Sequence, residues 1–89
     1  MAKLIFTQQL ARFTEVPEIE TSATRLRDAL ETGFQVNSRL RGYILDEQGH
    51  LRSNVVIFID GLRVRDRVKL DTALDAGSQI YVLQALSGG

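Results

Sequence analysis

The feature that most constrains the fold is the uninterrupted apolar run "VVIFI", which covers residues 55–59. All five residues favour β-structure, and Asp60-Gly61 directly after them is a strong turn signal. Because unbroken apolarity indicates burial on both faces, the run predicts a central strand of a sheet. The 89-residue chain contains no cysteine, so a single hydrophobic core has to stabilise it without disulfides or thiolate metal sites.

Further strand patterns lie on both sides of this run. The segment "KLIF" near the start predicts a first strand that extends toward Leu10, and Pro17 marks a turn beside a second, irregular strand within 13–20. The alternation in "LRVRDRV" predicts a short, half-exposed strand over 62–68, and "IYVLQAL" predicts the last strand. The residues between these two, "LDTALDAGSQ", are typical of a loop, and Asp46 to Gly49 are typical of a hairpin-like turn.

One amphipathic helix is predicted within "TSATRLRDALETGF". Its apolar residues recur at spacings of three and four, the period of one helical face; they are Ala23, Leu26, Ala29, Leu30 and Phe34. We expect Thr21 or Ser22 to be the N-cap and Gly33 to be the left-handed residue that ends the helix. A further short helical turn is indicated in "VNSRLRGYIL", although Asn37 and Ser38 weaken the pattern.

The order of elements is strand, strand, helix and then two or three strands. Because helices and strands do not alternate regularly, a doubly wound sheet is not expected. The order fits an α+β fold of the ubiquitin-like β-grasp type, with a mixed four- to five-stranded sheet packed on one main helix. We expect residues 1–84 to form this domain and residues 85–89 to form a flexible C-terminal tail.

The balance of charge argues against two classes of partner. Lys plus Arg and Asp plus Glu both number 11, so the formal net charge is zero. A neutral domain has no general electrostatic attraction for nucleic acid or for anionic lipid. No apolar run approaches the ~20 residues that span a bilayer, and the first residues show no signal-peptide cleavage pattern. We therefore expect a cytoplasmic protein without nucleic-acid or membrane partners.

No internal constellation of side chains indicates an active site. His50 is the only histidine and lies beside Gly49 in a predicted loop, where a solvated side chain is the usual case. Asp71 and Asp75 are four residues apart but belong to a predicted loop, where aspartates commonly form turns. The glycine patterns of nucleotide-binding loops are absent from the sequence. We therefore predict no catalytic residue and no metal ligand.

Three arginines are candidates for docking a partner. Arg63, Arg65 and Arg67 share one face if residues 62–68 form a strand. Such a row can bind a phosphate or an acidic partner. A row of charges on an edge strand is more often solvated and suppresses aggregation, so both interpretations stay open.

Several stretches together resemble the MoaD/ThiS family of sulfur-carrier proteins. The segment "RLRGYILDEQGHLRSNVVIFIDGLRV" is similar to the central part of that family, and "KLDTALDAGSQIYVLQALSGG" is similar to its closing part, which ends in Gly-Gly. The helix region "ETSATRLRDALE", preceded by "LARFT", is similar to its first turn and helix. The likeness covers nearly the whole chain, and it is greatest to the stand-alone carriers of the cysteine-synthesis type. The chain departs from the family at Asp75–Ile80, which is less acidic, and at Thr14–Pro17, which lacks glycine.

The resemblance implies a function for the last residues of the sequence. An E1-like enzyme would use ATP to adenylate the Gly89 carboxylate, which a sulfurtransferase step would convert to a thiocarboxylate. Leu86, Ser87 and Gly88 would be the residues of the tail that the partner enzymes recognise. No permanently bound cofactor is implied. The second partner would be a sulfur-accepting synthase, and the family leaves the acceptor open among molybdopterin, the thiamin thiazole, cysteine, a tRNA base and siderophore-type metabolites.

Two other functions are compatible with the same sequence. One is a ubiquitin-like modifier joined through Gly89 to lysines of target proteins. The other is a non-covalent β-grasp interaction module or small subunit, such as that of molybdopterin synthase, in which Gly-Gly is an incidental chain end. None of the three is an enzyme in its own right.

Overall fold

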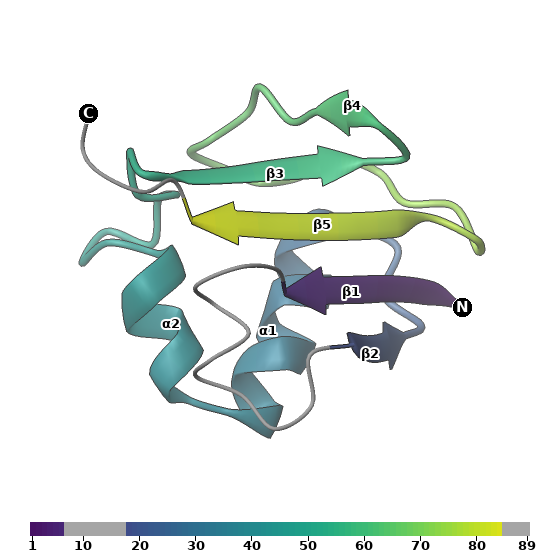
Figure 1. The fold of residues 1–89 in the computed structure, drawn as a ribbon, viewed down its shortest axis with the longest axis horizontal. Helices are drawn as coiled ribbons and strands as arrows, with labels where there is room; N and C mark the ends of the chain where they lie inside the picture. Colours follow the sequence, from purple (N-terminus) through teal and green to yellow (C-terminus); the bar gives the residue numbers. More distant parts are fainter. Residues whose placement is uncertain (7–17, 85–89) are drawn as a thin grey trace.

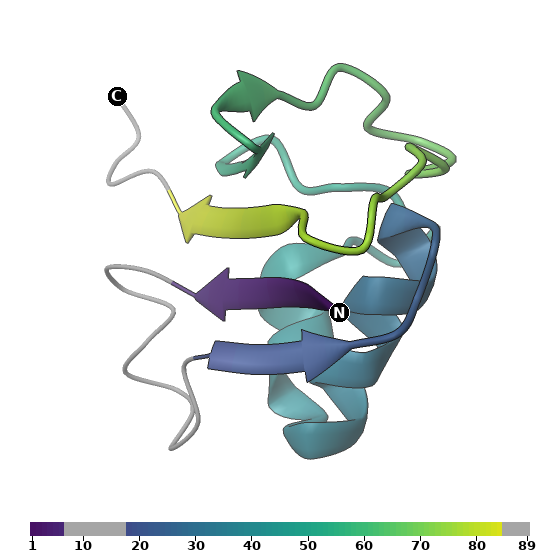
Figure 2. The same cartoon turned by 90° about the vertical axis from the view of Figure 1, so that its right-hand side faces the viewer.

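The computed structural model describes residues 1–6 and 18–84, and in them a five-stranded sheet carries two helices on one face (Figures 1 and 2). The strand order is β2-β1-β5-β3-β4; β1 pairs with β5 in parallel, and all other pairs are antiparallel. The elements are β1 Ala2–Phe6, β2 Glu18–Thr21, α1 Leu26–Val36, α2 Arg39–Ile44, β3 Val55–Ile59, β4 Leu62–Arg63 and β5 Gln79–Gln84. The predicted mixed sheet packed on one main helix is confirmed.

The centre of the sheet is β5 and not β3. Strand β3 is second from the edge, since β4 pairs with it over only two residues. Val55 and Ile57 are fully buried against the helices, whereas Val56 and Phe58 on the other face are only half-buried. The prediction of burial on both faces was therefore wrong, because both helices cover the same face and leave the other open.

The core lies between the sheet and the helices. The predicted helical stripe is confirmed, since Leu26, Ala29, Leu30 and Phe34 are all buried. The largest fully buried side chains come from every layer of the fold; they are Leu4, Leu26, Leu30, Leu40, Ile44, Ile57, Leu70, Ile80, Val55 and Val82. Burying each such side chain is worth about 1.5–3 kcal/mol, so these residues carry most of the drive to fold.

The predicted caps of α1 were wrong. The helix starts after Arg25, which makes no side-chain capping bond, and Thr21 lies in β2, where its hydroxyl accepts the N–H of Ala23 at 3.1 Å. Gly33 does not end the helix but lies buried inside it. A Cβ at Gly33 would stand 2.8 Å from Leu4 Cδ2 and 3.0 Å from Phe6 Cζ. The glycine is needed because α1 passes very close to β1.

Helix α2 is a full element rather than a weak turn. It buries Leu40 and Ile44, and the side-chain oxygen of Asn37 accepts the N–H of Arg39 at 3.1 Å, next to its start. The residue that weakened the sequence pattern thus satisfies one of the free N–H groups at the helix start.

The hairpin-like turn after α2 is confirmed. Leu45 and Leu51 pair across it, the Asp46 carboxylate accepts the N–H groups of Gln48 and His50, and Gly49 has a φ of +80°. A φ of this sign favours glycine, which accounts for that residue in the turn.

Residues 64–78 form a long irregular connection that is held by side chains. The strand expected over 62–68 is limited to Leu62–Arg63, and the loop expected after it is confirmed. From α1, Arg27 donates to the carbonyl oxygens of Val68 at 2.8 Å, Lys69 at 2.9 Å and Gly49 at 3.1 Å. One guanidinium therefore ties the connection and the turn of 46–50 to the helix. The extension toward Leu10, the Pro17 turn, the first part of the irregular strand and the tail of 85–89 lie outside the described residues.

The two helical glycines give a matched test of this packing. Gly42 of α2 is exposed and a Cβ there meets nothing within 4 Å, whereas Gly33 has no room for one. We expect Gly42→Ala to raise the free energy of unfolding by up to about 1 kcal/mol, the gain in helix propensity. Gly33→Ala should lower it by about 1 kcal/mol, because overpacking of ~1–3 kcal/mol exceeds the same gain. Urea denaturation measures both, and a shift of both variants in the same direction would contradict the close approach.

Candidate functional site

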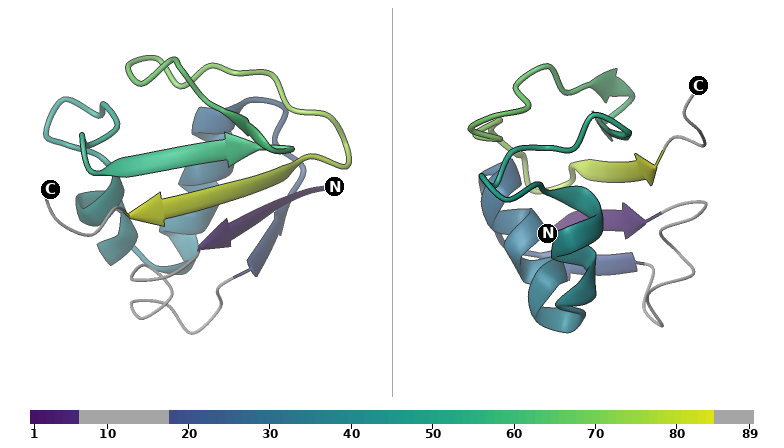
Figure 3. Two further views of the ribbon diagram at one scale, coloured as in Figure 1. Left: turned by 45° about the horizontal axis from the view of Figure 1, so that its top comes forward. Right: turned by 90° about the vertical axis from the view of Figure 1, so that its left-hand side faces the viewer.

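The predicted attachment and recognition residues, Leu86 to Gly89, lie outside the described residues, and the structure places only the strand that leads to them. That strand is β5, which ends at Gln84 opposite Val55, the first residue of β3. Because β1 runs parallel to β5, both end at the same end of the sheet (Figures 1 and 3). The tail therefore leaves from the middle strand of the sheet.

One row of side chains crosses the whole open face of the sheet. The register places Ile5 beside Glu18 on one side and beside Tyr81 on the other, and Phe58 stands between Tyr81 and Arg63. In strand order the row is Glu18, Ile5, Tyr81, Phe58 and Arg63. It begins with an acid on the edge strand β2, is apolar over the three inner strands, and ends with a base on the edge strand β4. We call it the transverse row.

The middle of the transverse row continues toward the end of β5. Ile5 and Phe58 are half-buried and Tyr81 is 36% exposed, and in the neighbouring position Val56 pairs with Leu83. Leu83 immediately precedes Gln84, so an uncovered apolar strip approaches the point where the tail begins. Apolar surface with an aromatic centre and a charged rim is typical of protein–protein interfaces. In the sequence these residues appear only as alternate positions within their separate strands. The strand register is needed to align them in one row.

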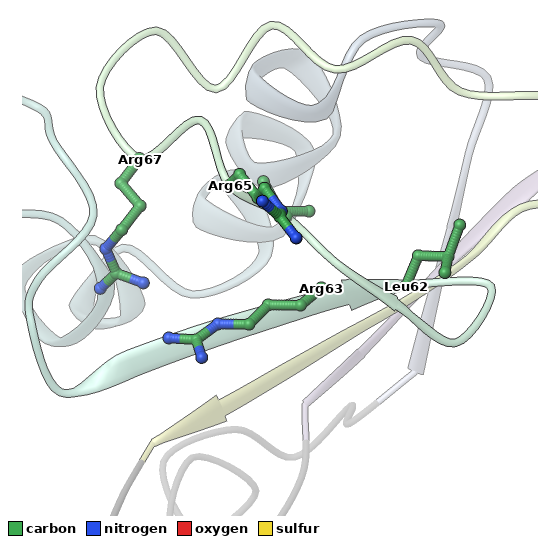
Figure 4. A pocket seen from close by; sticks show the side chains of 5 residues that line it. Leu62, Arg63, Arg65 and Arg67 are labelled. Carbon is green, nitrogen blue, oxygen red and sulfur yellow. The ribbon is translucent and has the colours of Figure 1, made fainter.

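The three candidate arginines line a groove of about 600 Å³ with Leu62 and Val64 (Figure 4). They do not act alike, so the prediction of one shared face is only partly right. Arg67 Nη2 donates to the carbonyl oxygen of Val55 at 2.8 Å and to that of Arg52, which ties the connection to the start of β3. Arg63 and Arg65 are exposed and make no hydrogen bond or ion pair with the described residues, so only these two are free to meet a partner.

Two aspartates organise the loops around the groove and the turn. Asp66 accepts the backbone N–H groups of Asp71, Lys69 and Val68, which lowers the pKa of its carboxyl group. The N–H of His50 does the same for the pKa of Asp46. Both carboxylates serve loop structure rather than proton transfer.

The remaining titratable side chains of the described residues do not assemble into a reactive group. Asp71 pairs with Arg25 at 3.9 Å, and the backbone N–H of Asp75 donates to the Ser78 hydroxyl at 2.8 Å. Among residues 1–6 and 18–84, no cluster of three His, Asp or Glu side chains has the arrangement to hold a metal ion. The same part of the chain contains no helix of a length and apolarity that would cross a membrane.

No protein-family model and no curated protein sequence matches the chain. Solved structures do. The small archaeal modifier protein 1 (SAMP1) from Methanosarcina acetivorans is 26% identical with a TM-score of 0.81, over 99% of this chain and 95% of that one. The BexX/CysO complex from Amycolatopsis orientalis matches with a TM-score of 0.84 at 14% identity, over the full length of both chains. Urm1 from Sulfolobus solfataricus matches with a TM-score of 0.71 at 23% identity, over 92% and 97%.

These likenesses show that the chain has the ubiquitin-like β-grasp fold. The resemblance to MoaD/ThiS-type carriers is confirmed at that level, since the similar chains are small β-grasp proteins over their whole length.

The division among the arginines has a direct test. Removal of the Arg67 side chain removes its hydrogen bonds to the carbonyl oxygens of Val55 and Arg52, of which the Arg52 oxygen still accepts the N–H of Val55. Arg67→Ala should therefore lower the free energy of unfolding by about 1–2 kcal/mol. Arg65→Ala removes an exposed side chain without partners and should change it by less than about 0.5 kcal/mol. Chemical denaturation measures the difference, and equal losses in the two variants would contradict the assignment.

Asp66 should make the stability depend on acid pH. Because its pKa is lowered in the folded state, its contribution is complete above the unfolded pKa of about 3.9 and is lost as the pH falls through the lower folded pKa. We expect Asp66→Asn to be less stable at neutral pH and to lose less stability on acidification below about pH 4. Thermal unfolding across this range measures it. Asp75→Asn, whose carboxylate accepts no hydrogen bond from the described residues, is the control and should keep the wild-type acid dependence.

Proposed function

We propose that the chain is a sulfur-carrier protein that presents the carboxylate of Gly89, as its C-terminal residue, to partner enzymes. The observation that carries the proposal is that β5, the central strand of a ubiquitin-like β-grasp sheet, is followed after three residues by Gly88-Gly89.

The chemistry requires activation because a carboxylate is a poor acyl donor. The α-carboxyl group has a pKa near 3.5 and is ionised at neutral pH, so its leaving group would be oxide. In the first step a carboxylate oxygen of Gly89 attacks the α-phosphate of ATP, pyrophosphate leaves, and an acyl-adenylate forms. Hydrosulfide then attacks the acyl carbon and AMP leaves, which yields the thiocarboxylate. With a persulfide donor an acyl disulfide forms first, and a thiol then cleaves it to the thiocarboxylate.

Glycine suits both steps because the acyl-adenylate has to be kept from water. An enzyme that encloses the end of the tail needs a narrow channel, and residues without a Cβ allow close backbone approach. Five extended residues beyond Gln84 reach at most about 18 Å, at ~3.3–3.6 Å each. The folded domain can therefore dock on the enzyme surface while Gly89 occupies the active site.

The transverse row is the surface that we assign to docking of the activating enzyme. Ile5, Tyr81 and Phe58 form its apolar middle, and the strip through Leu83 leads to the start of the tail. Binding of this face offsets the entropy lost when the tail is ordered in the channel.

A ubiquitin-like modifier is the second candidate, favoured by the name of the 26% identical archaeal structure. A lysine amine would then attack the acyl carbon of the same acyl-adenylate, AMP and a proton would leave, and an isopeptide bond to Gly89 would form in place of the thiocarboxylate. Sulfur transfer and conjugation share the first step, so one protein can serve both.

Intact-mass measurement tests the carrier function. After incubation with its activating enzyme, ATP and a sulfur donor, the chain should gain the mass of one oxygen-to-sulfur exchange, located at Gly89 by fragmentation. Deletion of Gly89, or one alanine appended after it, should abolish the exchange, whereas Arg39→Glu on α2 should leave it unchanged. Full exchange in the chain with the appended alanine would refute the assignment of Gly89.

Adducts in a cell lysate distinguish the modifier. Tagged chain should be recovered in covalent complexes. Because no Lys or Arg follows Lys69, trypsin digestion should leave the peptide of residues 70–89 attached to the target lysines through Gly89. Conjugates without any thiocarboxylate would assign the chain to protein modification alone.

A further inference from the structure

The transverse row is close to symmetric about its centre. Tyr81 stands on the central strand, apolar Ile5 and Phe58 flank it, and Glu18 and Arg63 form the two ends with opposite charge. At about 4.8 Å per strand, the two ends are about 19 Å apart. A surface with this order is complementary to a copy of itself turned by a half rotation about the axis of β5.

We propose that the open face binds a second copy of the chain in a face-to-face dimer whose two-fold axis runs along β5. That rotation exchanges the two edges of the sheet, so it sets Tyr81 against Tyr81 and Ile5 against Phe58 of the second copy. Glu18 then faces Arg63 of the second copy, and the contact occurs twice by symmetry. A two-fold axis across the strands would instead oppose like charges at both edges, which is unfavourable.

The charges needed for the dimer are available at both edges. Arg63 has no partner among the described residues, and the exposed Arg65 lies in the same groove (Figure 4). On the opposite edge Glu18 and Glu20 share the open face with Lys3, whose ammonium lies 3.6 Å from Glu18. The acidic edge therefore carries two carboxylates for one ammonium, and the basic edge carries two unpaired guanidinium groups.

The size of the face sets the strength of the contact. Five strands of two to six residues make a surface about 20 Å wide and at most about 20 Å long. This is well below the roughly 800 Å² per partner of a standard interface, so the dimer is weak and reversible. Two twisted sheets can stack about 10 Å apart with their strands near −30°, which keeps the centres of the two rows opposed.

The dimer has a consequence if the same face also docks the activating enzyme, and this consequence rests on the proposed function. Self-association and docking to the enzyme then exclude each other. At high concentration the carrier is therefore largely dimeric, with its docking face covered by the second copy. The dimer itself depends only on the transverse row.

Charge exchange tests the geometry with the full-length chain. Sedimentation equilibrium from about 10 µM to about 1 mM, together with the shift of amide NMR signals on dilution, should show a concentration-dependent dimer with changes centred on Ile5, Tyr81 and Phe58. Arg63→Glu alone and Glu18→Arg alone should each raise the dissociation constant roughly tenfold or more, because each replaces two attractions by two repulsions.

Mixing the two variants is the decisive measurement. Arg63→Glu and Glu18→Arg together should form a mixed dimer, since both edge contacts are then again between opposite charges. The double variant should recover self-association. Arg39→Glu makes the same charge change on α2 and should leave the dimer unaffected. Added salt should weaken all of these dimers.

Three results would overturn the inference. The first is a wild-type chain that stays monomeric at the highest concentration, with no change of NMR signals on dilution. The second is a dimer that Arg63→Glu leaves intact, which would place the contact elsewhere. The third is a mixture of the two variants that associates no better than either alone, which would exclude an axis along β5.

Discussion

The close contact between α1 and β1 is the constraint on which the rest of the structure depends. The helix lies so near the sheet that Gly33 faces Leu4 and Phe6 with no space for a Cβ. This spacing brings a thin layer of mainly Leu, Ile and Val side chains into the buried interior. Because α1 and α2 share that one face, no helix of residues 1–6 and 18–84 covers the other. The open sheet face is thus the cost of building a core from so few elements.

In the loops, arginine side chains donate hydrogen bonds to backbone carbonyl oxygens, which in helices and sheets are bonded to backbone N–H groups. The connection of 64–78 has no ladder of its own, and its backbone groups still need partners. Arg27 of α1 supplies two of them by donating to the carbonyl oxygens of Val68 and Lys69. Arg67 in turn donates from the connection to the carbonyl oxygen of Val55. Arg52 donates to that of Gly42 at 2.8 Å. Several of the described arginines are therefore structural. Arg63 and Arg65 on the groove beside β4, by contrast, make no hydrogen bond or ion pair with the described residues.

Local sequence patterns predicted the helices and strands. The strand register determines which of their side chains lie together on one surface. The helical stripe and the strands of 3–6, 55–59 and 80–84 follow from periodicity, which needs only near neighbours in sequence. The role of Gly33 was missed because a glycine near a helix end and a glycine under a sheet look alike in sequence. The transverse row joins residues as distant as Glu18 and Tyr81, so only the strand pairing brings it together. The tail of 85–89 stays a prediction that rests on the resemblance and not on any local physical signal.

The position of β5 also orders events during synthesis of the protein. Without β5, the described strands make two separate pairs, β1 with β2 and β3 with β4, and nothing joins them into one sheet. Isolated two-stranded pairs are at best marginally stable. Folding of the sheet therefore waits until the residues of β5, up to Gln84, have been made. A chain that stops before β5 contains the two outer pairs of strands but cannot join them into this sheet.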